Sequence, residues 1–117
     1  MKPCQKTHIR ALEKIVGRLD LIEESPANMV WIMKEGIWEY CGKRKQRKFP
    51  DLILGYNEKT IPIELKSIET NHRERAIEQI ASGRDFILGV LNKNCPYGRI
   101  AYYSPRMNIS SEKILFE

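Results

Sequence analysis

The sequence predicts an α/β fold in which α-helices flank a central mixed β-sheet. Two segments, about 7–23 and 71–82, carry apolar residues at helical spacing, and short apolar or alternating runs typical of strands lie between and after them. The length of 117 residues suits one domain with one modest core. Because no repeat or long linker divides the chain, we expect a single domain over residues 1–117.

The first element is predicted as a helix from about Thr7 to Glu23. Its apolar stripe has the spacing of one helix face and consists of Ile9, Leu12, Ile15, Val16, Leu19 and Ile22. Thr7 can cap the start of this helix, and Ser25-Pro26 forces the chain to leave it.

Four strands are predicted next, in two hairpins, over residues 29–33, 37–41, 51–56 and 60–66. Turns at 34–36 and 57–59 connect the strands within each hairpin. Pro62 lies within the fourth strand and costs it one ladder hydrogen bond.

A second helix is predicted from about Asn71 to Ser82, because Asn71 and Glu74 resemble a capping box and Gly83 is a natural C-terminal stop. The apolar run Phe86–Leu91 is typical of a strand buried on both faces. After a loop at 92–98, residues Arg99–Tyr103 complete the predicted sheet.

The net charge of +5 arises from one short segment. Residues 43–48 carry five positive charges and no negative one, so the rest of the chain has 15 of each sign. The five cations are Lys43, Arg44, Lys45, Arg47 and Lys48. A cluster of this kind attracts phosphates whatever the base sequence, and its alternative interpretation is a solvated basic loop.

The cysteines and the apolar runs restrict the setting of the protein. Cys4, Cys41 and Cys95 form an odd, scattered set that predicts neither a disulfide framework nor a zinc site. No apolar stretch approaches the roughly 20 residues of a membrane span, and the N-terminus lacks the apolar run of a secretion signal. We therefore expect a cytoplasmic protein in a reducing compartment, without a membrane partner.

Two carboxylates and one ammonium are predicted to meet at one end of the sheet. Glu64 and Lys66 point to the same face of their strand, since side chains alternate with period two. Asp51 begins the preceding strand, and we expect its antiparallel partner to lie close to Lys66 or just before it. Two close carboxylates suit Mg²⁺ or Mn²⁺, and such a metal with a neighbouring lysine can support phosphodiester hydrolysis.

Pro50-Asp51, a twelve-residue gap and Glu64-Leu65-Lys66 together resemble the motif of the PD-(D/E)XK nuclease superfamily, which has the restriction-endonuclease-like fold. The resemblance covers about two-thirds of the chain. It implies that Asp51, Glu64 and the carbonyl of Leu65 hold the metal and that Lys66 positions the nucleophile. It also implies an acidic residue in the first helix, for which Glu13 is the candidate, and a glutamine on the later helix, for which Gln79 is the candidate.

Within that superfamily, the size and layout are most similar to the small archaeal Holliday junction resolvases. The loop of residues 42–50 and Glu64-Leu65-Lys66-Ser67 correspond to their aspartate loop and strand end. This loop is rich in Lys and Arg and lacks the serine that the resolvases carry, so junction specificity stays open.

The sequence thus predicts an Mg²⁺-dependent endodeoxyribonuclease that selects DNA by structure, such as a junction, flap or end, and acts as a homodimer. The cations of residues 43–48, with Gln79 and Arg73, are the predicted DNA contacts, and Arg75 and Arg99 are the next candidates. One alternative is a non-catalytic nucleic-acid-binding module on the same fold. Another is a subunit that is active only within a partner complex.

Overall fold

The computed structural model describes residues 3–34, 50–69 and 73–116. Its elements are helix α1 (Pro3–Gly17), the 3₁₀ turns η1 (Leu19–Ile22) and η2 (Pro26–Asn28), strands β1 (Met29–Lys34), β2 (Leu52–Tyr56) and β3 (Thr60–Ser67), helix α3 (Arg73–Gly89), and strands β4 (Tyr97–Tyr103) and β5 (Ile109–Leu115). This order confirms the predicted class, a mixed sheet flanked by helices.

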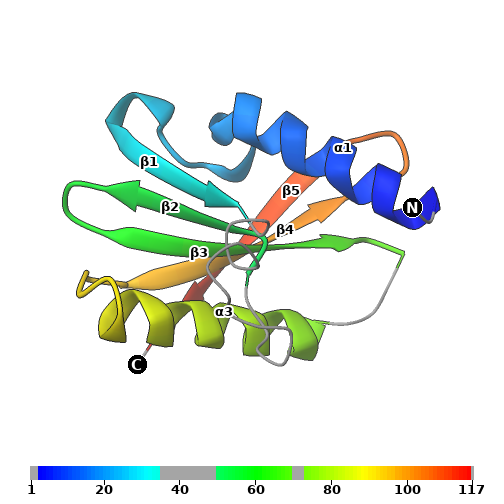
Figure 1. The fold of residues 1–117 in the computed structure, drawn as a ribbon. Coiled ribbons are helices and arrows are strands. Elements are labelled where there is room, and N and C mark those ends of the chain that lie inside the picture. The colour runs from blue at the N-terminus through cyan, green and yellow to red at the C-terminus, as the bar shows by residue number, and fades with distance from the viewer. Residues whose placement is uncertain (1–2, 35–49, 70–72, 117) are drawn as a thin grey trace.

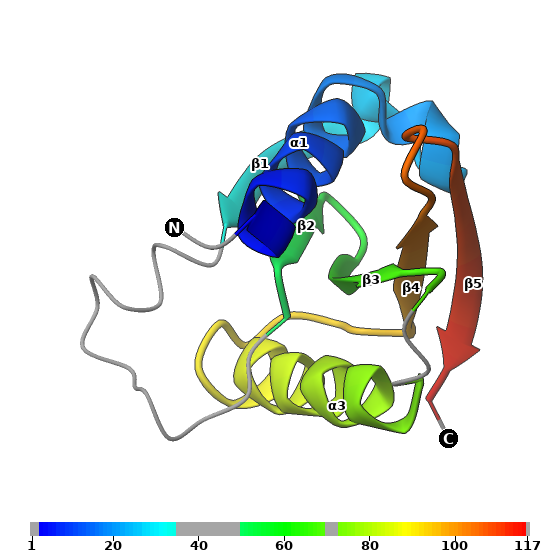
Figure 2. The ribbon, with the colours of Figure 1, turned by 90° about the vertical axis from the view of Figure 1, so that its right-hand side faces the viewer.

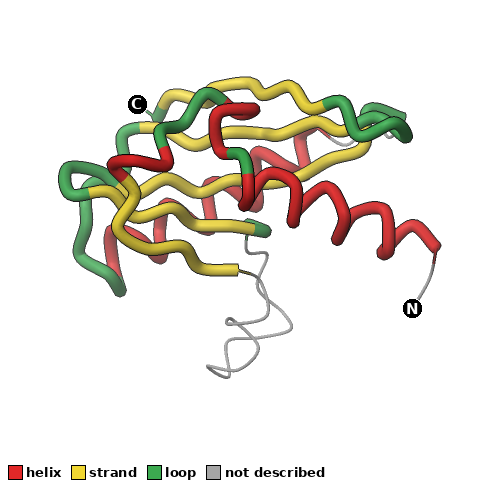
Figure 3. The backbone as a smooth tube through the Cα atoms, turned by 90° about the horizontal axis from the view of Figure 1, so that it is seen from above, coloured by secondary structure: helices red, strands yellow, loops and turns green. Residues whose placement is uncertain are grey.

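Five strands lie side by side in the order β1-β2-β3-β4-β5 (Figure 3). β1–β2, β2–β3 and β4–β5 pair antiparallel, whereas β3 and β4 pair parallel. Parallel neighbours need a crossover connection, and α3 provides it between β3 and β4. The crossover places α3 on the face of the sheet opposite α1 (Figures 1 and 2).

The sheet separates the core into two layers. On the α1 side, alternate strand residues pack beneath Ala11 and Ile15 of the helix; the fully buried members of this layer include Leu52, Leu54, Ile61, Ile63 and Leu65. On the α3 side, the buried residues are Ile53, Ala76, Ile80, Phe86, Ile87, Cys95 and Ile100. Within the described ranges, no helix is long and apolar enough to span a membrane.

The first helix is shorter at its C-terminal end than the sequence predicts, and it begins before Thr7. It ends at Gly17, because Arg18 leaves the helical region with φ −140° and ψ 71°. The following 3₁₀ turn still buries Leu19 and Ile22, so the apolar spacing continues although the α-helix does not. Ile9 was assigned to the apolar stripe but is 37% exposed.

The prediction of a stop at Gly83 and a strand at Phe86–Leu91 is wrong. Helix α3 continues past Gly83 and includes Phe86 to Gly89, with Ile80, Gly83 and Ile87 buried on one face. A side chain at Gly83 would meet Pro50 and Pro62 at 2.8 Å, so this glycine permits close packing of the helix on the sheet. It is an interior contact residue and not a helix terminus.

The last strand was not predicted, and one predicted strand cannot be compared. β5 pairs along its whole length with β4, from Tyr97↔Leu115 to Tyr103↔Ile109. Its polar centre, Ser110-Ser111-Glu112-Lys113, hides the strand pattern in the sequence. The predicted strand at 37–41 lies outside the described residues. Among the described strands, β1 pairs with β2.

The close approach at Gly83 gives a prediction about stability. Gly83→Ala should destabilise the fold by about 1–2 kcal/mol, because overpacking against two proline rings outweighs the gain in helix propensity. Gly89→Ala is the matched control on the same helix, since an added Cβ there meets nothing within 4 Å. Urea denaturation of both variants measures the difference, and equal stabilities would contradict the packing role of Gly83.

Candidate functional site

Asp51 and Glu64 meet at one end of the sheet, as predicted. Both residues are buried, with 6% and 3% of their surface exposed. The backbone N–H of Asp51 donates to Oε1 of Glu64 at 3.1 Å. Asp51 lies opposite Glu64, one or two residues from the expected partner, because Tyr56 bonds to Lys59 and tightens the turn between β2 and β3.

Among the described residues, the ladder between β2 and β3 stops before it reaches Leu65. The pairing of β2 with β3 ends at Leu52↔Ile63, and the N–H of Leu65 instead donates to Oδ2 of Asp51 at 2.8 Å. In a strand, the N–H and C=O of one residue lie on the same edge. The carbonyl of Leu65 therefore lies on the same edge as Asp51, where the sequence predicts a metal ligand.

Lys66 lies beside the carboxyl pair. Its Nζ is 3.6 Å from Oε2 of Glu64, and the Lys66 side chain is 17% exposed. This contact confirms that Glu64 and Lys66 share one face of β3. Lys66 and His8, whose side chains are 17% and 31% exposed, are the partly solvent-accessible residues that contact the buried carboxyls.

His8 is a member of the cluster that sequence reasoning missed. Its Nε2 lies 3.2 Å from Oδ1 of Asp51, and its Nδ1 lies 3.3 Å from the hydroxyl of Tyr103 on β4. A neutral His8 that donates from Nε2 accepts the Tyr103 hydroxyl at Nδ1. With Leu65 on the other oxygen, His8 fixes the orientation of the Asp51 carboxylate. The only signal in the sequence was a histidine near the start of a helix.

Glu13, the acidic residue expected from the first helix, does not join this cluster. Its side chain is exposed, and no described contact links it to Asp51 or Glu64. Five residues separate it from His8, and a helix turns by about 100° per residue, so the two side chains diverge by roughly 140°. Since His8 faces Asp51, Glu13 is turned away from the pair.

The electrostatics of the pair favour one shared proton. Burial acts to raise the pKa of Asp51, but hydrogen bonds from His8 and Glu64 outweigh it and lower that pKa. Burial, with the charge of Asp51 beside it, raises the pKa of Glu64 to about 10, and Lys66 offsets only part of this effect. A second negative charge is therefore costly here unless a cation joins the pair.

A divalent cation fits this donor set. Two buried carboxyls and a strand-edge carbonyl are hard oxygen ligands, and the unfavourable second charge is what such a cation relieves. Within the residues described, no three His, Cys, Asp or Glu side chains gather into a metal-binding group. Any metal at this site would thus depend on two side chains, the backbone and solvent.

The raised pKa of Glu64 predicts how stability depends on pH without metal. The folded state keeps a proton that the unfolded state loses above about pH 4.5, so this group destabilises the fold as pH rises toward 10. Glu64→Gln removes that effect. In EDTA, its stability relative to wild type should increase by on the order of 2–4 kcal/mol between pH 5 and pH 8.

Urea denaturation at the two pH values measures this change. Glu13→Gln is the control, because it makes the same substitution at an exposed residue outside the carboxyl pair. A wild-type protein that becomes more stable relative to Glu64→Gln at pH 8 would contradict the shared proton.

The predicted DNA contacts are only partly within the structure. Lys43, Arg44, Lys45, Arg47 and Lys48 lie outside the described residues. Gln79 is half-buried on α3, next to the buried Ile80. Arg73 is exposed, and its Nη2 pairs with Glu112 of β5 at 2.6 Å. Arg99, a reserve candidate for DNA contact, is buried and paired with Glu24.

Comparisons of the chain with protein-family models, with curated proteins and with solved structures found no match.

Proposed function

We propose that this protein is a metal-dependent endonuclease that hydrolyses DNA phosphodiester bonds on a restriction-endonuclease-like fold. The observation that supports it best is the buried pair of Asp51 and Glu64 with Lys66 at 3.6 Å. Hydrolysis forms one bond from a water oxygen to phosphorus and breaks the bond from phosphorus to a sugar oxygen. It requires a metal site, a positioned water and a group that stabilises negative charge, and this cluster contains side chains suited to each.

Asp51, Glu64 and the carbonyl of Leu65 would hold Mg²⁺ or Mn²⁺. When bound, the cation would lower the pKa of a coordinated water molecule and neutralise negative charge on the leaving oxygen. The protein's part is to hold its ligands in place. His8 and the N–H of Leu65 each donate to one oxygen of Asp51, and the N–H of Asp51 donates to Glu64. Such supporting hydrogen bonds orient metal ligands.

Lys66 would position the attacking water and stabilise the charge that develops on the phosphoryl oxygens. Its ammonium is close enough to Glu64 to remain at the site and exposed enough to reach a bound phosphodiester. A lysine is suited to this task because it acts as a compact point charge with three donors.

The proposed substrate is DNA, recognised by structure at a junction, flap or end and bound by the basic residues 43–48. A domain of 117 residues with one short cationic cluster has little material for reading a long base sequence. Cleavage of both strands would use two copies of the site, and we propose a homodimer for that reason.

Cleavage of labelled linear, forked and four-way DNA, each with Mg²⁺ and with EDTA, tests the proposal. We expect cleavage only with the metal and a preference for the forked or four-way substrate. DNA binding without cleavage of any substrate would favour a non-catalytic binding module. Cleavage that appears only after a second protein is added would favour the partner-dependent subunit.

The basic cluster gives a separate prediction. If two or three of its cations contact phosphates, replacing all five by Gln or Ser should reduce the slope of log K against log salt by about two to three. Affinity should fall equally across DNA sequences, because phosphates carry no base information. Binding titrations from low to high salt measure this slope. An unchanged slope would identify residues 43–48 as a solvated loop that does not contact DNA.

A further inference from the structure

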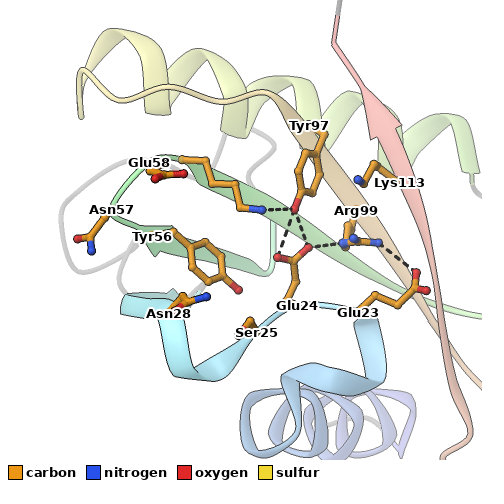
Figure 4. Close-up of a pocket in the computed structure, with 11 residues that line it drawn as sticks. Glu23, Glu24, Ser25, Asn28, Tyr56, Asn57, Glu58, Tyr97, Arg99 and Lys113 are labelled. Carbon is orange, nitrogen blue, oxygen red and sulfur yellow. Dashed lines mark hydrogen bonds and ion pairs between the residues drawn. The ribbon is translucent and has the colours of Figure 1, made fainter.

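A pocket of about 560 Å³ lies at the opposite end of β3 from the carboxyl pair. Its walls come from three places: the segment after α1, the turn between β2 and β3, and the paired strands β4 and β5 (Figure 4). The volume is within the range of small-molecule sites. The lining is strongly polar, and its charged members are Glu23, Glu24, Glu58, Lys59, Arg99 and Lys113.

Three cations surround the ring of Tyr97 in this pocket. Nζ of Lys113 lies 4.3 Å from the ring centroid, Nζ of Lys59 lies 4.9 Å from it, and the guanidinium of Arg99 lies 5.3 Å from it. Lys59 also donates to the Tyr97 hydroxyl at 2.8 Å. Positive charges gathered around one ring repel one another unless anions offset them.

Among the described residues, the carboxylates of the pocket form ion pairs only with Arg99. Glu24 is buried, accepts from Nε of Arg99 and from the Tyr97 hydroxyl, and Glu23 lies 3.6 Å from Nη1 of Arg99. Among the described residues, neither Lys59 nor Lys113 has a carboxylate within ion-pair distance. Glu58 is exposed on the turn and enters no described ion pair. Lys59, which bonds to the Tyr97 hydroxyl, and Lys113 are therefore the two cations of the pocket that lack a direct ion pair among the described residues.

We propose that this pocket binds a phosphate group, held by Lys59 and Lys113 beside Tyr97. Phosphate suits the donors better than carboxylate does. A carboxylate ligand is recognised best by the two parallel donors of an arginine, and Arg99 is already occupied by Glu24 and Glu23. The available donors are lysine ammoniums, which bind phosphate as point charges, and the amide side chains of Asn28 and Asn57.

The site is independent of the proposed nuclease centre. Lys59 precedes the first residue of β3, whereas Glu64 and Lys66 lie near its end, about five residues or roughly 16 Å further along. The pocket could receive a free phosphomonoester or the terminal phosphate of a nucleic-acid strand, since both present the same group.

Calorimetric titration of the full chain with inorganic phosphate and with a nucleoside 5′-monophosphate tests the proposal. We expect saturable binding that Lys113→Gln weakens by about tenfold, as expected for the loss of a hydrogen bond to a charged group. Lys113 is exposed, so its substitution leaves the core intact. Lys93→Gln is the matched control, because it removes the same charge from an exposed residue outside the pocket.

Two further arms separate the alternatives. Oligonucleotides with and without a 5′-phosphate distinguish a strand terminus from a free phosphomonoester as the natural source of the group. Asp51→Asn should leave phosphate affinity unchanged, so failure of the nuclease proposal and failure of this one are distinguishable. Absence of saturable binding at millimolar phosphate, or equal weakening by Lys113→Gln and Lys93→Gln, would overturn the phosphate site.

Discussion

Asp51→Asn and Glu64→Gln should each reduce DNA cleavage by about three orders of magnitude or more, while both variants still bind DNA. Each substitution removes one anionic ligand from a buried pair with little change of shape. Each variant leaves one carboxylate and the uncharged Leu65 carbonyl, and these offset the charge of a divalent cation less well than two carboxylates do. Affinity for DNA should hold or rise slightly, because less negative charge lies near the phosphates.

The two variants should lose activity for a reason other than unfolding. Without metal, Glu64→Gln should gain stability relative to wild type between pH 5 and pH 8, because the wild-type fold must keep a proton on Glu64 that the unfolded chain has released. Asp51→Asn loses its charge-assisted contacts with His8 and Leu65 and should be the less stable of the two. If Glu64→Gln is stabilised and yet does not cleave DNA, the loss of activity reflects a catalytic role of Glu64 and not a structural one.

The measurement is single-turnover cleavage of labelled DNA at saturating protein, with binding followed separately in Ca²⁺ or EDTA. Glu13→Gln is the matched control, since it removes an exposed carboxylate from the same half of the chain. Wild-type-like cleavage by both Asp51→Asn and Glu64→Gln would rule out the proposed site. A large loss in Glu13→Gln would show that the first helix contributes its glutamate after all.

Sequence pattern alone was sufficient to place Asp51, Glu64 and Lys66 together. That inference needs only the period of a strand and one tight turn, and both are local properties. The error of one or two residues in register came from the turn, where Tyr56 and Lys59 pair and leave two residues outside the ladder. Side chains that meet across two strands joined by a tight turn are therefore predictable from the sequence.

The contribution of the first helix was not predictable in the same way. Whether His8 or Glu13 faces Asp51 depends on the rotation of α1 over the sheet, and packing of Ala11 and Ile15 sets that rotation. Periodicity suggested a broader stripe that included Ile9, which is exposed. Amphipathic spacing identifies a buried face, but it fixes the direction of a neighbouring polar side chain only when the buried residues are known.

The length of α3 shows a second limit. A short apolar run suits a buried strand and a buried helix equally, and Phe86–Leu91 belongs to the helix up to Gly89. Gly83 was assigned as a stop because glycine lowers helix propensity. Its tertiary contact with Pro50 and Pro62 outweighs that local preference, and it also packs α3 against the residue that precedes Asp51.

Lys66→Ala should reduce the turnover number by about 10²- to 10⁴-fold and leave metal binding measurable. Removing the ammonium leaves Asp51, Glu64 and the Leu65 carbonyl in place, so the proposed metal ligands persist. The positioned donor near the scissile phosphate is lost. The effect should therefore appear in the chemical step, with little change in the affinity for DNA.

Metal binding by Lys66→Ala should nevertheless shift to higher pH. Lys66 lowers the pKa of Glu64, so its removal raises that pKa further and makes the proton harder for a metal to displace. Calorimetric titration with Mn²⁺ at two pH values should show a larger loss of affinity at the lower pH.

Asp51→Asn is the comparison for that titration, because it should weaken Mn²⁺ binding at both pH values. If Lys66→Ala also abolishes Mn²⁺ binding at high pH, the 3.6 Å contact with Glu64 holds the carboxyl in place and the catalytic role of Lys66 is wrong. If Mn²⁺ binding persists while turnover collapses, the ammonium acts on the phosphodiester and not through the metal ligands.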